Sequence, residues 1–215
     1  MSRLTCTISI SLDGYVAGPD PGPDRGLGAG GEELHEWIFG LASWREMHGR
    51  EGGERNVDSD MLQEGLDATG AIIVGKRMFG GWDGPWGDEP TLGVWGENPP
   101  FDVPVFVLTH YPRETATVGQ TTFTFVSDGI ESALEQARAA AGGKDVGIGG
   151  GANVIQQYLT AGLLDELQLS LVPLLLGGGV RLLDNLGEAP PKLEQTRVLE
   201  SPSGVAHLRY EVLKP

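Results

Sequence analysis

Residues 145–155 read DVGIGGGANVI, with three consecutive glycines between a segment typical of a strand and a segment typical of a helix. Glycine loses more conformational freedom on folding than any other residue, so three in a row need a structural reason. A strand that runs through such a turn into a helix brings main-chain N–H groups and the positive end of a helix dipole toward an anion. A sharp turn without a ligand is the alternative, and it would need only one glycine. The candidate phosphate contacts here are Gly149, Gly150, Gly151, Ala152 and Asn153.

Two common phosphate motifs do not fit this stretch. A P-loop needs a Lys followed by Ser or Thr, and neither is present. Gly147, Gly149 and Ala152 satisfy the spacing of the Rossmann fingerprint, but Asp165 and Glu166 begin the next strand, whereas the acidic partner should end it and reach a ribose. The unit is also the last strand–helix–strand unit of the chain. We therefore expect an anion site at a strand end that differs from a standard Rossmann site.

Strands and helices alternate on both sides of this unit. The expected strands cover residues 5–12, 71–75, 103–110, 121–126 and 144–150, with another starting at 165. The expected helices cover residues 31–49, 58–68, 129–142 and 152–162, with one helical turn from residue 76. Asp58 or Ser59 is expected to cap the second helix, and Ser127 or Asp128 the helix from 129. Residues 193–213 contain two alternating runs joined by SPSG, which indicates an antiparallel hairpin.

This alternation predicts an α/β fold in which a central, mostly parallel sheet has helices on both faces, a three-layer arrangement. The C-terminal hairpin adds an antiparallel edge. With 215 residues and 40% apolar residues, the chain fits one domain over residues 1–215. Ligands of open α/β sheets bind at the carboxyl ends of the strands, so the strand ends are the places to look for a site.

Composition excludes several classes of partner. The net charge of −15 argues against nucleic-acid binding, and no run of eighteen apolar residues is present to span a membrane. The N-terminal segment lacks the apolar core of a signal peptide, so we expect a cytoplasmic protein. The single cysteine, Cys6, lies in the first strand and is expected to be a buried, inert thiol.

Two more strand ends carry groups suited to phosphate. Lys76 and Arg77 follow one buried strand, and Thr109, His110 and Arg113 follow the next. A hydroxyl, an imidazole and a guanidinium suit a phosphate monoester. Each group alone is more often a solvated surface. Two phosphate sites and a monoester site on one edge predict a dinucleotide with a 2′-phosphate, which means NADPH.

The order of these motifs resembles a known family. SLDGYVAGPD, IIVGKRMFG, VPVFVLTHYPRE, TTFTFV, GIGGGANVIQQYL and LLDELQLSLVPLLLGGGVRLL occur in the same order in the dihydrofolate reductase-like superfamily. The chain is similar to the bacterial group related to the C-terminal reductase domain of the bifunctional riboflavin-biosynthesis deaminase/reductase, over nearly its whole length. The resemblance implies a dihydrofolate reductase-like fold, an NADPH-dependent reductase of a small substrate, and a homodimer.

The resemblance also implies roles for particular positions. Gly75, Lys76 and Arg77 match the turn that meets the cofactor phosphates, and Thr109 and His110 match the strand end that faces the 2′-phosphate. The glycine turn matches the pyrophosphate site. The positions that match the cofactor's other rim are Pro173 and Gly177–Gly179.

This sequence departs from the family at several positions. Lys76 stands where Arg is common, and Met78 stands where a Thr hydroxyl is common, which loosens the expectation for NADPH. No folate-enzyme carboxylate motif is recognisable on the first helix, and the deaminase H-x-E…C-x-x-C motif is absent. The expected substrate is a small, pyrimidine- or pterin-like heterocycle, and no metal is expected.

Candidate catalytic residues lie near the first strand. Asp13 in SLDGYVAG is the best-placed carboxylate for orienting a substrate, with an Asx-turn as its structural alternative. Glu36 is the second catalytic candidate. Tyr15, Trp37 and Trp82 are candidates for the substrate side, although Trp37 also suits a core position.

Residues 82–100 form a long loop that contains Trp82, Trp86 and Trp95, which would form either a lid over a planar ring or a hydrophobic plug. The lid is the favoured interpretation. Two further function classes stay open: a flavin- or nucleotide-binding protein without reductase turnover, and a scaffold that has lost its cofactor.

Overall fold

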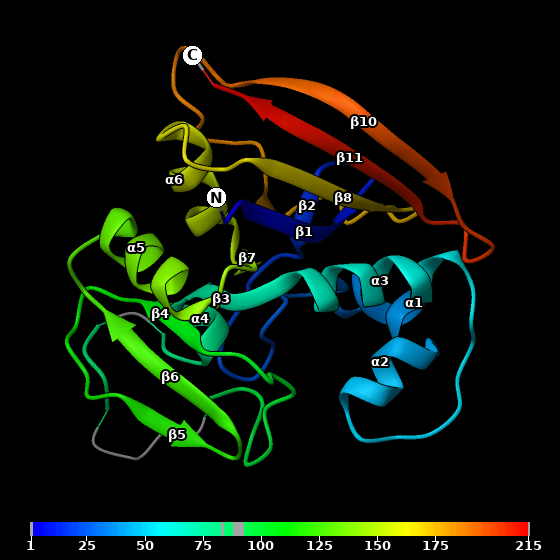
Figure 1. Ribbon diagram of the computed structural model, residues 1–215. Coiled ribbons are helices and arrows are strands. Elements are labelled where there is room, and N and C mark those ends of the chain that lie inside the picture. The colour runs from blue at the N-terminus through cyan, green and yellow to red at the C-terminus, as the bar shows by residue number, and fades with distance from the viewer. Residues whose placement is uncertain (1, 83, 88–92, 215) are drawn as a thin grey trace.

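Nine strands form one mixed sheet in the computed structural model, which describes residues 2–82, 84–87 and 93–214 (Figure 1). The strands are β1 (Leu4–Ser11), β3 (Thr69–Gly75), β4 (Val105–Leu108), β5 (Ala116–Val118), β6 (Thr121–Val126), β7 (Asp145–Gly150), β8 (Glu166–Val172), β10 (Lys192–Glu200) and β11 (Ala206–Leu213). Their order is β10-β11-β8-β1-β7-β3-β4-β6-β5. All pairings from β8 to β6 are parallel, whereas β5, β10 and β11 pair antiparallel.

This topology confirms the mostly parallel sheet and the C-terminal hairpin at one edge. Strand β5 at the opposite edge was not expected, because its three residues are too few to show a period. A second, two-stranded sheet pairs β2 (Tyr15–Ala17) with β9 (Val180–Arg181).

Helices cover both faces of the large sheet (Figure 1). One face packs against α5 (Ile130–Ala140) and α6 (Ala152–Thr160), which share the main hydrophobic core with the central strands. The other face looks toward α1 (Glu36–Phe39), α2 (Ala42–Met47) and α3 (Val57–Ala68), which follow a 3₁₀ helix, η1 (Gly31–His35). The short helix α4 (Lys76–Phe79) continues from β3, as expected.

The helix expected over residues 31–49 is wrong as a single element. It divides into η1, α1 and α2, because the chain leaves the helical conformation after Gly40 and Leu41 is extended, with φ −73° and ψ 144°. This bend lets Leu34 and Leu41 both reach buried positions.

Two predicted helix caps are also wrong. The side chain of Asn56, not that of Asp58 or Ser59, caps α3 by accepting hydrogen bonds from the N–H groups of both those residues. The N-cap position of α5 is Gly129, with no side-chain cap, rather than Ser127 or Asp128. Because Asn56 caps α3, Asp58 and Ser59 lie inside its first turn, where both are buried.

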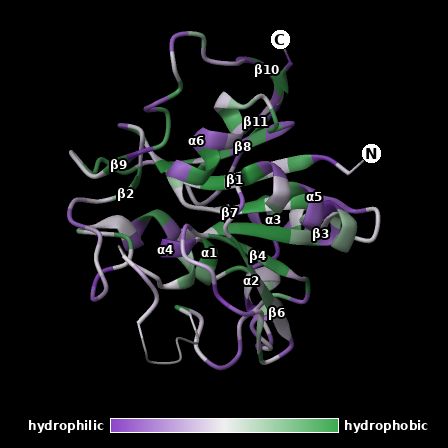
Figure 2. Ribbon diagram, turned by 90° about the vertical axis from the view of Figure 1, so that its left-hand side faces the viewer, coloured by the Kyte–Doolittle hydropathy of each residue, from purple (hydrophilic) through white to green (hydrophobic). Residues whose placement is uncertain are grey.

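The two faces of the sheet differ in chemistry. Apolar residues of the central strands point toward α5 and α6, and Figure 2 shows hydrophobic residues concentrated along these strands. The alternate positions of β1, β8 and β11 are polar and face α3, as the contacts of Gln168 and His207 with that helix show. Cys6 lies on the apolar side, and burial raises the pKa of its thiol to about 12, which confirms the prediction of an inert cysteine.

In the part of the chain that the structure describes, no helix has the length and apolar character needed to cross a membrane.

Candidate active site

A cleft separates the polar face of the sheet from α1–α3 and extends to the carboxyl ends of β3, β4 and β7. Thr7 and Ser9 of β1 and Ser170 of β8 contribute to its floor, and Trp37 of α1 and Met61 of α3 lie across from them. Alternation along β1 and β8 places these hydroxyls on one face of the sheet. The alternating pattern of the first strand therefore reflects a polar cleft rather than open solvent.

The middle of the cleft floor is open because β7 carries glycines there. Gly147 and Gly149 present no side chain, and Thr7 of the neighbouring strand is exposed although β1 lies in the centre of the sheet. On the β3 side the floor is bordered by an apolar side chain, since a Cβ atom at Gly149 would lie only 3.1 Å from Cγ1 of Val74. The floor therefore offers a flat space bordered by hydroxyls, which suits a planar ring.

The three strand ends predicted from the sequence meet at one end of this cleft. Gly75 ends β3 and Lys76–Met78 follow it, while Thr109 and His110 follow β4. Residues 149–153 cover the end of β7 and the start of α6, and all of these residues line the cleft. Their distances along the sequence are large, but β7, β3 and β4 are consecutive in the sheet. The fold thus assembles one site from segments about 40 and 70 residues apart.

The turn between β7 and α6 has room for a phosphate group. A Cβ built on Gly151 meets no atom within 4 Å, so the space beside this residue is open. Gly151 is the N-cap residue of α6, and no side chain caps the helix. The first N–H groups of α6 are therefore available to an anion, and the nine-residue helix adds its dipole. These features fit the pyrophosphate of a dinucleotide.

Lys76 and Arg77, which follow β3, both contact the loop that comes next in the chain. The Nζ atom of Lys76 donates hydrogen bonds to the carbonyl oxygens of Trp82, at 2.8 Å, and Gly84, at 2.5 Å. It also lies over the ring of Trp86, 4.6 Å from the centroid. The guanidinium of Arg77 lies 5.9 Å from the ring centroid of Trp82, which lines the cleft. Both cations thus connect the end of β3 to the following loop.

The three tryptophans of the long loop lie in different surroundings. Residues 83 and 88–92 of the loop lie outside the described part. Trp86 packs against Phe79 and Phe125, and Trp95 packs against Phe101 in the same aromatic cluster, which is the plug interpretation. Trp82 lines the cleft, and Trp95 also borders it.

Several other candidates lie outside the lining of the cleft. The guanidinium of Arg113 stacks on the aromatic cluster, 4.8 Å from the ring centroid of Trp86 and 5.0 Å from that of Phe125. Glu36 is exposed on α1. The remaining candidates beyond the lining are Asp13, Tyr15, Pro173 and Gly177.

Asp13 joins two loops. Its carboxylate accepts hydrogen bonds from the Ser11 hydroxyl, at 2.5 Å, and from the main-chain N–H groups of Leu176 and Gly177, at 3.2 and 2.7 Å. The Ser11 hydroxyl, followed by these N–H groups, lowers the pKa of Asp13 to about 2. Tyr15, on the adjoining β2, packs under the guanidinium of Arg181. Asp13 thus tethers the exit of β1 to the exit of β8.

This tether predicts a pH-dependent contribution to stability. The pKa of Asp13 is about 2 in the folded protein, which is below its ordinary value in the unfolded chain. The ionised carboxylate therefore stabilises the fold at pH values above the ordinary pKa of an aspartate, and this stabilisation is lost as the pH falls toward 2. Asp13→Asn is expected to lower the urea midpoint at pH 6, and the difference from the unsubstituted protein is expected to shrink at pH 3. A difference that stays constant between these pH values would contradict the assignment.

Sequence reasoning missed one histidine at the cleft. His35 of η1 lines the cleft, and its Nδ1 atom is buried with no hydrogen-bond partner among the described residues. Burial lowers the pKa of this imidazole, which favours its neutral form. A lone histidine without a motif carries no signal in the sequence, so only the fold identifies it.

A family model covers nearly the whole chain. Residues 2–207 match the model of the RibD C-terminal domain. The Bacillus subtilis (strain 168) protein YyaP is 27% identical over 221 residues, which cover 97% of this chain and 94% of YyaP.

Two solved structures have the same fold. A putative riboflavin biosynthesis protein from Shewanella sp. PV-4 superposes with a TM-score of 0.62 at 21% identity, covering 99% of each chain. Dihydrofolate reductase from Enterococcus faecalis, complexed with NADP(H) and RAB-propyl, gives a TM-score of 0.51 at 14% identity, covering 98% of this chain and 96% of that chain. These likenesses confirm the dihydrofolate reductase-like fold, and because the family model spans residues 2–207, the chain belongs to the RibD C-terminal domain family.

Proposed function

We propose that the protein is an NADPH-dependent reductase that transfers hydride to a small planar heterocycle of the pyrimidine or pterin type. The observation that carries this proposal is the meeting of three phosphate-suited strand ends at one end of a cleft with a flat, hydroxyl-bordered floor. Membership in the RibD C-terminal domain family supports a reductase-type function. The NADP(H) bound by the Enterococcus faecalis enzyme of the same fold supports the choice of cofactor.

The ends of β3, β4 and β7 have separate tasks in this proposal. The turn Gly149–Asn153 holds the pyrophosphate on main-chain N–H groups at the start of α6. Lys76 and Arg77 add positive charge from the end of β3, and Thr109 and His110 face the 2′-phosphate. Met78 packs beside the turn, since a Cβ on Gly150 would lie 3.5 Å from its Sδ atom.

NADPH supplies a hydride to the carbon of a C=N or C=O bond. The protein then has to hold the acceptor ring flat against the floor at Gly147 and Gly149, keep water from the reacting atoms and deliver a proton to the heteroatom. Trp37 and Trp82 line the cleft where they can cover such a ring. We assign them to the substrate side, with Asp13 and Tyr15 supporting the adjoining loop.

Cofactor preference tests the proposal directly. NADPH is expected to bind at least about tenfold more tightly than NADH, or about 1.4 kcal/mol, because only NADPH places a charged group at Thr109 and His110. Titration of tryptophan fluorescence with each cofactor measures both affinities, since Trp82 lies in the cleft. Equal affinities would contradict the 2′-phosphate assignment.

Turnover separates this proposal from the other function classes. We expect NADPH oxidation with at least one member of a panel of pterins, pyrimidines and quinones. Tight NADPH binding without turnover would indicate a nucleotide-binding protein, and absence of binding would indicate a scaffold. A homodimer and a cytoplasmic location remain parts of the proposal, and sedimentation would test the former.

A further inference from the structure

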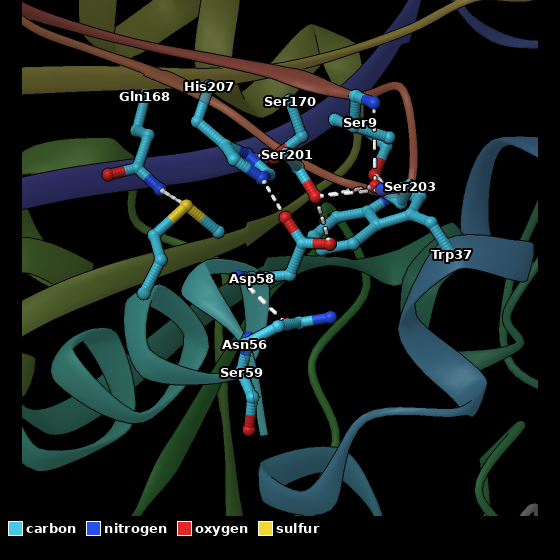
Figure 3. A network of polar contacts seen from close by, with 12 residues as sticks. Ser9, Trp37, Asn56, Asp58, Ser59, Gln168, Ser170, Ser201, Ser203 and His207 are labelled. Atoms are coloured by element: carbon cyan, nitrogen blue, oxygen red, sulfur yellow. Dashed lines mark hydrogen bonds and ion pairs between the residues drawn. The ribbon is translucent and has the colours of Figure 1, made fainter. Parts of the chain in front are cut away.

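Three polar residues lie side by side across adjacent strands on the cleft face of the sheet. Ser9 of β1 pairs in register with Ser170 of β8, and Ser170 pairs with His207 of β11 (Figure 3). All three are buried, with exposed fractions of 5%, 1% and 2%. The Nδ1 atom of His207 lies 3.0 Å from the hydroxyl oxygen of Ser170.

A carboxylate from α3 completes this row. The Oδ1 atom of Asp58 lies 2.7 Å from Nε2 of His207, and Asp58 is fully buried. Both ring nitrogens of His207 thus have an oxygen partner, one on each side. The Ser201 hydroxyl donates a hydrogen bond to the other carboxylate oxygen (Figure 3), and Ser201 is not among the residues that line the cleft. The carboxylate at Nε2 fixes the orientation of the imidazole, so that Nδ1 points to Ser170.

The row ends at the reacting part of the cleft. Ser170 and Ser9 line the cleft, whereas His207 and Asp58 lie behind them. Gly149 and Gly151 of the turn after β7 line the same cleft as Ser9 and Ser170. Trp37 packs against this row, with its Nε1 atom 3.2 Å from the Ser9 hydroxyl and its ring centroid 5.2 Å from that of His207.

We propose that Ser170, backed by the buried His207–Asp58 pair, delivers the proton that accompanies hydride transfer in this cleft. This inference rests on the reductase function proposed above and supplies its missing proton donor. Ser170 would contact the substrate heteroatom and is the catalytic residue, whereas His207 and Asp58 act through it as positioning residues.

The acceptor bond gains one hydride and one proton in this step. Hydride from NADPH forms a C–H bond at the carbon of the C=N or C=O group, and the electron pair of the broken π bond moves to the heteroatom. The heteroatom takes the proton of the Ser170 hydroxyl while Ser170 takes the proton from Nδ1 of His207. The imidazole is then neutral, with its Nε2–H donated to Asp58, and it regains a proton through Ser170 after the product leaves.

The groups that contact His207 determine which charges act on its ring. Asp58 is the charged group in contact with it, while Ser170 and Trp37 are its neutral neighbours. Arg209 lies two residues further along β11 on the same face, where it forms ion pairs. The partners of Arg209 are Glu64 and Glu166. Asp58 is therefore the charged group that positions the imidazole for proton transfer to Ser170.

The first test follows the proton without needing turnover. In NADPH-loaded protein labelled with ¹⁵N-histidine, the proton on Nδ1 of His207 is expected to exchange with water through Ser170 and the cleft. Ser170→Ala should slow this exchange about tenfold or more, and Ser170→Thr should restore it because it keeps the hydroxyl. Exchange in Ser170→Ala as fast as in the unsubstituted protein would overturn the relay.

Ser201→Ala is the matched control. It removes a hydroxyl from the same carboxylate without touching the cleft, so the exchange rate should stay within about twofold. A purely structural network predicts equal effects of Ser170→Ala and Ser201→Ala, and that result would also overturn the relay. His207→Gln identifies the resonances among the four histidines.

Kinetics with any acceptor from the panel provide the second test. Ser170→Ala should lower kcat about 100-fold with little change in KM, and His207→Gln should lower kcat at least about tenfold, again with little change in KM. If His35→Gln lowers kcat about 100-fold and Ser170→Ala leaves it unchanged, His35 is the donor and the relay is wrong. Absence of turnover with every acceptor would refute the reductase proposal, and the exchange experiment alone would then decide the relay.

Discussion

Replacing Gly151 by aspartate is expected to weaken NADPH binding by about 100-fold, or about 2.7 kcal/mol, while the fold keeps its stability. Gly151 is the N-cap residue of α6, its φ of −89° suits any residue, and the space beside it is open. An aspartate there caps the helix by accepting from its first N–H groups, which stabilises the fold slightly. The same carboxylate occupies the anion position and repels a phosphate. Fluorescence titration and thermal unfolding measure the two effects.

Gly151→Asn is the matched control for this substitution. Asparagine has nearly the same shape and the same capping ability but carries no charge, so the loss of affinity should be about tenfold or less. A Gly151→Asp protein that binds NADPH as tightly as the unsubstituted protein would show that the turn does not hold the pyrophosphate. A drop in melting temperature for both variants would point to damage to the fold instead.

The largest expected effect on stability comes from Gly70→Ala. A Cβ at this position of β3 would lie 2.1 Å from the carbonyl oxygen of Ala141, at the end of α5, and 2.8 Å from Cβ of Lys144. Because a main-chain atom cannot move aside as a flexible side chain can, the strand or the helix end has to shift. The free energy of unfolding is expected to fall by about 3 kcal/mol, measured by urea denaturation.

Gly65→Ala provides the comparison for Gly70→Ala. Gly65 lies inside α3, and a Cβ there meets no atom within 4 Å. Alanine in a helix interior is expected to raise the free energy of unfolding by about 0.5–1 kcal/mol, because it restricts the unfolded chain. If both substitutions destabilise the protein equally, the close approach at Gly70 is not the cause.

Much of the fold could be predicted because its signals are local. A few neighbouring residues are enough to predict the conformation of three segments: the β-branched run before Lys76, the glycine turn before α6 and the paired runs around SPSG. The predictions failed where local signals were equivalent. Asn56, Asp58 and Ser59 are all good N-cap residues, and only the entry angle of the chain selects Asn56.

The strand ends that line the cleft could be predicted for a related reason. The carboxyl ends of parallel strands meet at one edge, so a residue that follows such a strand is placed by topology alone. Lys76, Thr109 and Gly151 follow that rule. Arg113 does not, because four residues beyond Thr109 the chain has turned and its guanidinium stacks on the aromatic cluster.

The sequence by itself determined the order of strands and helices, the C-terminal hairpin and the strand ends that carry phosphate-suited groups. Each of these follows from periodicity or from glycine and charge at a defined point of the chain. Only the tertiary structure decided that Asp58, Ser170 and His207 meet behind the cleft, and that Asp13 joins two loops. The physical reason is register: contacts between residues 37 to 164 positions apart depend on how strands and helices pack together, and no local pattern records that packing.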